Sequence, residues 1–107
     1  MDTQVFYLHA QTCKTLSHPK RLQILNILRY DELSAGDIVK KMKISKANLS
    51  QHLGRMRDAG ILEARRDGVS IHYRILSPKV TKACDLMREV LLDNLARKQN
   101  LMRSTKK

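Results

Sequence analysis

The chain has 107 residues, which is enough for one domain with a modest core, so an oligomer that buries more surface is expected. Its 21 Lys and Arg residues outnumber its 10 Asp and Glu residues, and the formal net charge of +11 favours a polyanionic partner. The first residues do not show the pattern of a secretory signal and no apolar run approaches the ~18 residues that span a bilayer, so we expect a cytoplasmic protein without a membrane segment.

Two helices are predicted at the start of the chain. Val5, Leu8 and Leu16 recur at helical spacing, and this segment stops at residues 17–19 because the residue before a proline is pushed out of the helical region. Pro19 suits the first turn of a second helix. We expect this second helix to be the buried centre of the domain because its apolar residues are so dense: Leu22, Ile24, Leu25, Ile27 and Leu28.

A helix-turn-helix is predicted next. Ser34, with Asp37 three residues later, resembles a capping box that opens a short third helix. Ser45 is placed to cap a fourth helix, and Gly60 follows as the left-handed residue that ends it. Only residues 43–45 connect the two helices, which is short enough to hold them at the steep angle of a helix-turn-helix.

A hairpin and a fifth helix complete the pattern. Residues 61–66 and 70–76 are predicted strands, the second of them with period-two alternation, and Asp67-Gly68 between them is a strong hairpin signal. Ser77-Pro78 then starts a fifth helix, which fades into a polar and basic tail. We therefore predict a mainly α fold with a small β-hairpin, namely a winged helix-turn-helix with five helices.

The fourth helix carries the side chains expected to read DNA. Its apolar stripe of Leu49, Leu53 and Met56 faces the protein and leaves a polar outer face, whose many short polar residues argue against an ordinary amphipathic surface helix. Asn and Gln can pair bidentately with adenine and Arg with guanine, while Ser and Lys contact base edges or the backbone. His52 borders the buried stripe, so a core-edge position and a DNA contact stay open for it. The other expected contacts are Lys46, Asn48, Ser50, Gln51 and Arg55.

Basic residues are concentrated between positions 40 and 74. Arg65 and Arg66 near the hairpin tip are expected to contact the minor groove or its phosphates, although a charged tip is also typical of a solvated turn. For Lys40, Lys41 and Lys43 two alternatives stay open, phosphate contacts and a solvated face.

Four segments follow one another in a specific order: LSHPKRLQIL at 16–25, ISKANLSQHL at 44–53, AGIL at 59–62 and IHYRI at 71–75. Together they resemble the arsenic-repressor (ArsR/SmtB) family of bacterial and archaeal transcription regulators, over about positions 8–95. The resemblance implies a homodimer in which the first and fifth helices pack across the two-fold axis. Two recognition helices would then meet successive major grooves of a near-palindromic operator. It also implies repression until an inducer lowers the affinity.

The usual metal positions of that family are absent here. In its metal-sensing members the third helix begins with a motif that holds two thiolates, and Ser34 and Gly36 stand in the matching places. The zinc-sensing members carry histidines on the fifth helix, and this helix has none. Its sulfide sensors have one cysteine in the second helix, where Asn26 stands near that place. We therefore expect no metal at these positions and no cofactor.

The two cysteines are too few for a disulfide scaffold and are expected to be free thiols. If the first and fifth helices meet in a dimer, Cys13 and Cys84 could be oxidised to a disulfide or polysulfide bridge, or bind a soft metal with His9. The alternative is plain packing, because Cys84 lies on the apolar stripe with Met87 and Leu91. The inducer stays unknown.

An enzyme is not expected. Asp85, Glu89 and Asp93 lie on one side of a helix, but neighbouring Lys and Arg residues favour a solvated, salt-bridged face. We interpret residues 1–98 as a DNA-binding and dimerisation domain and residues 99–107 as a basic tail that frays. The expected function is a homodimeric, sequence-specific repressor that binds a double-stranded operator. The alternative is a non-sensing winged-helix protein that binds DNA or shapes it.

Overall fold

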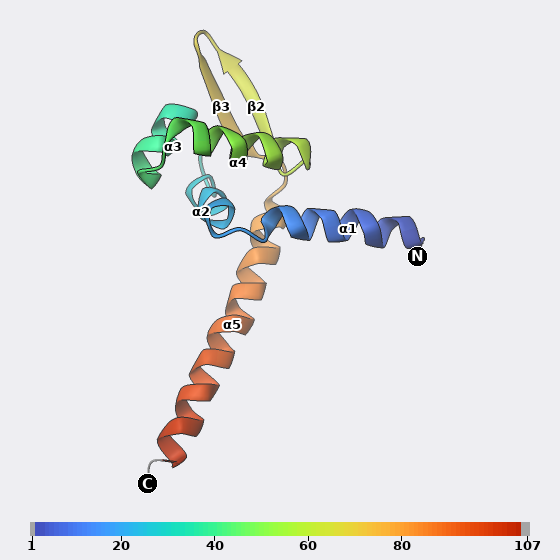
Figure 1. The fold of residues 1–107 in the computed structure, drawn as a ribbon, viewed down its shortest axis with the longest axis vertical. Helices are drawn as coiled ribbons and strands as arrows, with labels where there is room; N and C mark the ends of the chain where they lie inside the picture. The colour runs from blue at the N-terminus through green and yellow to red at the C-terminus, as the bar shows by residue number, and fades with distance from the viewer. Residues whose placement is uncertain (1, 106–107) are drawn as a thin grey trace.

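The computed structural model describes residues 2–105, and within them it contains five α-helices and three β-strands (Figure 1). The helix-turn-helix and the hairpin lie together at one end of the molecule, and two helices extend away from them. The predicted winged helix-turn-helix is therefore confirmed. In chain order the elements are α1 Thr3–Leu16, α2 Pro19–Ile27, β1 Leu33–Ser34, α3 Ala35–Met42, α4 Lys46–Asp58, β2 Leu62–Asp67, β3 Ser70–Ile75 and α5 Pro78–Thr105.

The helix-turn-helix begins and ends where the capping residues predict. The Ser34 hydroxyl accepts a hydrogen bond from the backbone N–H of Asp37 at 3.1 Å, and the Ser45 hydroxyl accepts one from Asn48 at 3.1 Å. Gly60, directly after the cap of α4, has a φ of 76°, which a residue with a side chain rarely adopts. Ser34 and Ser45 therefore fix the starts of α3 and α4, and the left-handed Lys43, with a φ of 54°, ends α3.

The sheet differs from the expectation in two respects. It has a third strand, because β1 pairs antiparallel with β3 and gives the order β1-β3-β2. A strand of two residues is too short to show any alternation, so the sequence pattern could not indicate it. The bend is also one residue later than predicted: Asp67 pairs with Ser70, which leaves Gly68 and Val69 as the turn. Gly68 takes the positive φ, 63°, at the first central position, as in type II′ hairpins.

The core lies where α2, α3, α4 and the start of β2 meet. As predicted, α2 supplies its centre, with Ile24 fully buried, and the stripe of α4 packs against it. Burial of each of these side chains removes apolar surface from water and stabilises the fold by roughly 1.5–3 kcal/mol. The buried apolar residues are Ile24, Leu25, Leu28, Ile38, Leu49, Leu53, Met56, Ile61 and Leu62.

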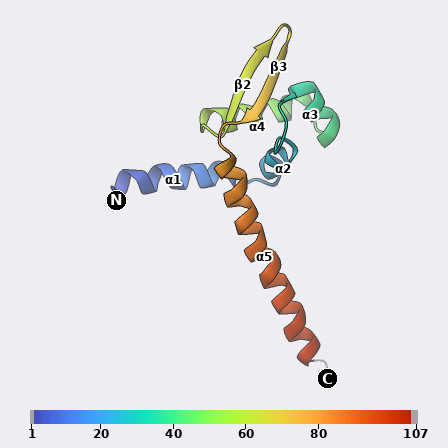
Figure 2. The ribbon, with the colours of Figure 1, turned by 180° about the vertical axis from the view of Figure 1, so that it is seen from behind.

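Helices α1 and α5 project from this core in different directions, as Figures 1 and 2 show from opposite sides. No residue of α1 is buried, and α5 is 28 residues long. The radius of gyration of the Cα atoms is 17.3 Å, whereas a compact domain of this length has about 13 Å. Helix α5 continues to Thr105, past the point at which the sequence analysis placed the tail. Residues 106 and 107 of that tail lie outside the described residues, and the domain division stays a prediction.

Among the described helices, α5 included, none combines the length with the continuous apolar character that crossing a bilayer requires.

Candidate nucleic-acid interface

The outer face of α4 is open to solvent. Leu49, Leu53 and Met56 point into the core together with His52, and the polar residues on the opposite side of the helix point outward. This division follows from the 3.6-residue repeat of the helix, which places the apolar stripe on one side. Five of the residues expected to contact DNA are exposed: Lys46, Asn48, Ser50, Gln51 and Arg55. Together with Ala47 and Gly54 they make up the outward side of the helix, and we call these five residues the α4 face.

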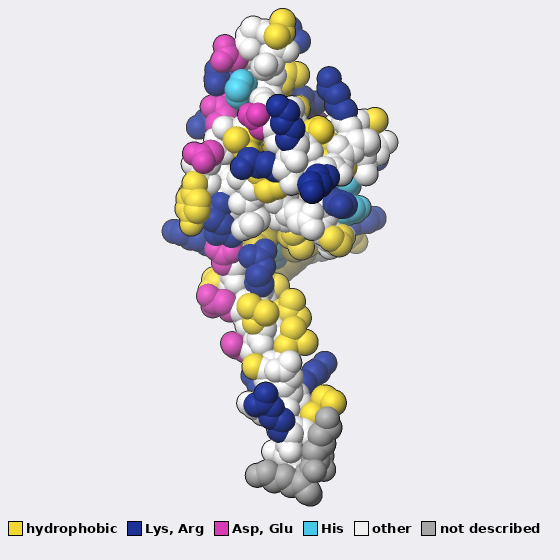
Figure 3. All heavy atoms as spheres, turned by 90° about the vertical axis from the view of Figure 1, so that its left-hand side faces the viewer, with side chains coloured by type: hydrophobic (Ala, Val, Ile, Leu, Met, Phe, Trp, Pro, Cys, Tyr) yellow, Lys and Arg dark blue, Asp and Glu magenta, His cyan; other side chains and the backbone are white. Residues whose placement is uncertain are grey.

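Basic side chains are common in the half of the molecule that carries the α4 face (Figure 3). In Figure 3, Lys and Arg side chains are spread over the upper part of the molecule, which holds the helix-turn-helix and the hairpin, while apolar side chains run along α5 below. Lys40, Lys41 and Lys43 are all exposed at the end of α3. An α-helix fits into the major groove of DNA, and lysines beside it are placed to meet the phosphates that border that groove.

An open groove of about 440 Å³ separates the first half of α4 from the hairpin. Lys46 and Ser50 line it from α4, and Ser70 and Ile71 line it from β3. It lies beside the N-terminus of α4, where the helix dipole and the Lys46 ammonium group both favour an anion. Among the described residues of this lining, Lys46 is the one that is charged, and Leu49, Leu53 and Tyr73 make much of the rest apolar.

The two hairpin arginines have different surroundings. Arg65 donates from Nε to Oε1 of Glu32 at 2.8 Å, and this bond lowers the pKa of the Glu32 carboxyl. Arg66 is exposed and, within the part of the chain that the structure describes, makes no ion pair. On the same side Arg74 pairs with Glu63 at 2.6 Å. Arg65 therefore ties the hairpin to the segment before β1, and Arg66 is the hairpin arginine free to meet a phosphate.

We expect Arg66→Ala to weaken binding to all duplexes similarly and to reduce the slope of log affinity against log salt by about 1, since one phosphate contact is lost. Arg65→Ala is the matched control, with a smaller change in slope because its charge is already paired with Glu32. Titrations of both variants at several salt concentrations test this. Equal slopes for the two variants would contradict the assignment.

His52 lies on the inner side of α4, where it is 6% exposed. Its Nδ1 accepts a hydrogen bond from Nε of Arg21 at 3.1 Å, and its ring meets the ring of His18 edge-on with centroids 4.5 Å apart. Of the two alternatives for His52, this geometry favours the core-edge position over a DNA contact. Arg21 and His18 were not predicted from the sequence, because their link to His52 joins parts of the chain about thirty residues apart.

The two cysteines differ in accessibility. Cys13 is exposed on α1, and Cys84 is half-buried on α5, against the core. Burial raises the pKa of the Cys84 thiol, with smaller opposing contributions from Arg88 and Arg29. Within residues 2–105 no cluster of three or more His, Cys, Asp or Glu side chains is arranged to hold a metal ion.

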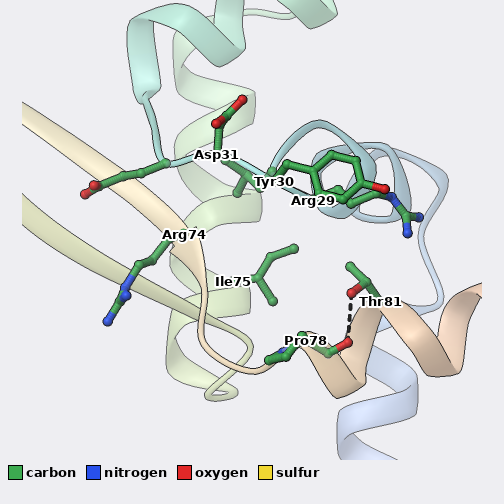
Figure 4. Close-up of a pocket in the computed structure, with 9 residues that line it drawn as sticks. Arg29, Tyr30, Asp31, Arg74, Ile75, Pro78 and Thr81 are labelled. Atoms are coloured by element: carbon green, nitrogen blue, oxygen red, sulfur yellow. Dashed lines mark hydrogen bonds between the residues drawn. The ribbon is translucent and has the colours of Figure 1, made fainter.

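A shallow pocket of about 320 Å³ lies between the segment that follows α2, residues 28–32, the end of β3 and the start of α5 (Figure 4). Beside it, Arg29 makes two hydrogen bonds of 2.6 and 2.7 Å to the Asp85 carboxylate, and these hold the pKa of Asp85 below its usual range. Arg88 also pairs with Asp85. Asp85 thus joins the end of α2 to α5 in a salt-bridged face, as the sequence pattern favours, rather than facing a substrate site.

Taken together, a helix-turn-helix with an open polar face, a hairpin beside it and basic side chains in the same half of the molecule define a winged-helix DNA-binding protein. Residues 18–64 match the model of the family described as bacterial regulatory protein, arsR family. The uncharacterized HTH-type transcriptional regulator Rv0081 of Mycobacterium tuberculosis is 38% identical over 85% of this chain and 82% of its own. The transcriptional repressor PagR of Bacillus anthracis is 35% identical over 76% of this chain and 82% of its own.

Solved structures agree with this similarity. The crystal structure of Rv0081 superposes with a TM-score of 0.81 at 35% identity and covers 91% of this chain and 98% of that one. The solution structure of the homodimeric winged helix-turn-helix domain of Mb0332 from Mycobacterium bovis has a TM-score of 0.78 at 28% identity, with 86% and 85% covered. The chain belongs to the arsR family of bacterial regulatory proteins and is a DNA-binding transcription regulator.

Proposed function

We propose that this chain is a sequence-specific repressor that binds a near-palindromic operator as a homodimer. The observation that carries the proposal is the α4 face, where Asn48, Gln51 and Arg55 stand exposed on a helix whose opposite side is locked into the core. Such side chains offer the paired donors and acceptors that distinguish base pairs in the major groove. The relative PagR, named a transcriptional repressor, supports the direction of the effect.

Helices α1 and α5 supply the proposed dimer interface. Apolar residues stand exposed along both helices in the single chain, and an apolar surface of this extent marks an interaction site. A second copy is the simplest partner, because a two-fold axis would also place two α4 faces on one side of the molecule, and the relative Mb0332 is homodimeric. The exposed residues are Val5, Phe6, Tyr7 and Leu8 on α1 and Leu86, Met87, Val90, Leu91, Leu92 and Leu95 on α5.

Selection from a randomised pool of double-stranded DNA tests the proposal. The chain is expected to enrich an inverted repeat whose half-sites are centred about one helical turn, or a multiple of it, apart. We call the enriched sequence the selected duplex. Placed over a promoter, it is expected to lower transcription when the protein is added. Failure to enrich any sequence would support the alternative of an architectural protein, and increased transcription would contradict repression.

We also propose that oxidation of the Cys13 and Cys84 thiols regulates DNA binding. Cys13 is exposed in the single chain, whereas Cys84 has a half-buried thiol with a raised pKa and is the slower partner. Joining the two thiols as a disulfide releases two protons and gives two electrons to an oxidant such as hydrogen peroxide. The proposed bridge would join α1 and α5, the helices of the proposed dimer interface.

The double variant Cys13→Ser, Cys84→Ser tests this regulation. We expect oxidant or polysulfide to weaken binding of the parent to the selected duplex and to leave the variant unchanged, because the variant cannot form the bridge. Affinity is measured for both proteins in reductant, peroxide, polysulfide and As(III). Equal responses of the two proteins to every reagent would contradict thiol sensing while leaving DNA recognition intact.

A further inference from the structure

Arg21 links three helices at one point. Its Nε donates to Nδ1 of His52 on α4 at 3.1 Å, and its Nη1 donates to the backbone carbonyl of Thr15 on α1 at 3.0 Å. Arg21 itself belongs to the first turn of α2. The guanidinium therefore holds α4 against the end of α1, the helix assigned above to the dimer interface. The position of the α4 face relative to the rest of the molecule depends on this contact.

His18 completes the cluster. Its ring lies edge-on to the ring of His52, with centroids 4.5 Å apart and planes at 61°. Its Nδ1 accepts a hydrogen bond from the backbone N–H of Lys20 at 3.3 Å and so caps the start of α2. Because Nδ1 of His52 is an acceptor from Arg21, the imidazole of His52 is neutral in this arrangement and carries its proton on Nε2. A second proton would sit on the nitrogen that faces the guanidinium.

We propose that His52 and Arg21 are positioning residues for the α4 face, and that protonation of His52 breaks their contact and lowers affinity for specific DNA. This inference rests on the proposed function, because it concerns how the same face is held for reading. The charged and titratable groups that act on His52 are His18, Lys20 and Arg21, and all three are basic. A proton on His52 would thus join a cluster of positive groups and turn an attractive contact with Arg21 into a repulsive one.

The direction of the pH effect follows from these neighbours. Burial lowers the pKa of His52 below 6.5, and the three basic groups lower it further, so the neutral acceptor form prevails at neutral pH. As the pH falls, His52 takes up a proton, Arg21 is released, and binding to the selected duplex weakens. Other histidines that become protonated at low pH are attracted to the DNA phosphates, and this attraction strengthens binding to any duplex. The ratio of specific to random affinity separates the two effects.

Nuclear magnetic resonance on the parent protein provides the first test. The pKa of His52 is measured from its ring carbon-bound protons, free and with the selected duplex. If neutral His52 favours binding, linkage requires that binding lowers its pKa, by about 1 unit for a tenfold coupling. A histidine that only felt the DNA phosphates would show a raised pKa. An unchanged or raised pKa in the complex would overturn the proposal, and this test needs no variant to fold.

The variant His52→Gln provides the second test, because glutamine is neutral and retains an acceptor at all pH values. From about pH 7.5 to about pH 5.5 the parent is expected to lose a few-fold in its specific-to-random affinity ratio, because a pKa below 6.5 leaves the protonation of His52 incomplete at the lower pH, and His52→Gln is expected to stay level. His9→Gln, at an exposed site on α1 outside the cluster, is the matched control and should behave like the parent. Level profiles for the parent, or a parallel decline in His52→Gln, would refute the role. Absence of any selected duplex at about pH 7.5 would instead refute the proposed function.

Discussion

Leu91→Glu in α5 is expected to convert the dimer into monomers and to weaken binding to the selected duplex by at least about 100-fold. Leu91 is 55% exposed in the single chain, in the middle of the apolar side of α5, and a carboxylate there would have to lose its hydration in the dimer. A monomer also loses the second half-site, whose contacts in a dimer act at high effective concentration. Sedimentation measures the mass and titration measures the affinity.

Ala96→Glu is the matched control for that variant. It adds the same charge to the same helix, but Ala96 is five residues further on and so about 140° away around the axis. Ala96 is exposed, is not among the residues assigned above to the dimer interface, and lies one turn after Leu92 at the border of the apolar side. We expect this variant to remain a dimer and to bind within a few-fold of the parent. A dimeric Leu91→Glu protein, or equal losses in both variants, would contradict the proposed interface.

Gln51→Ala and Asn48→Ala are each expected to cost about 1–3 kcal/mol on the selected duplex, or roughly five- to 150-fold in affinity, because a base-edge hydrogen bond is lost. Both side chains are exposed, so neither substitution removes core packing. Binding to a scrambled duplex should hardly change, and selection by the variants should relax at one position in each half-site. Gln99→Ala, an exposed position far along α5, is the control. Parent-like affinity and selectivity in both α4 variants would remove them from the reading surface.

The local parts of the fold are predictable from sequence. Ser34 and Ser45 each bond to a backbone N–H three residues later, so the start of α3 and of α4 depends on a few neighbouring residues. The spacing of Leu49 and Leu53 likewise determines which side of α4 is buried. For the same reason the exposed α4 face follows from the sequence with little help from tertiary structure.

The parts that sequence analysis missed are long-range contacts. Strand β1 exists only because Leu33 lies opposite Tyr73. Arg65 forms its ion pair only because the hairpin brings it to Glu32. The inward position of His52 depends in the same way on Arg21. Neither the apolar periodicity nor a motif of a short segment can predict such pairings, since they arise from how separate elements pack.

The most direct measurement for the central claim is a titration of the dimer with the selected duplex and with a scrambled duplex of equal length, at about 150 mM salt, with the stoichiometry determined. A regulator that reads sequence through the α4 face is expected to bind two chains per selected duplex and to prefer it by at least about 1,000-fold. Equal affinity for both duplexes, or a preference that survives replacement of both Asn48 and Gln51 by Ala, would contradict the account.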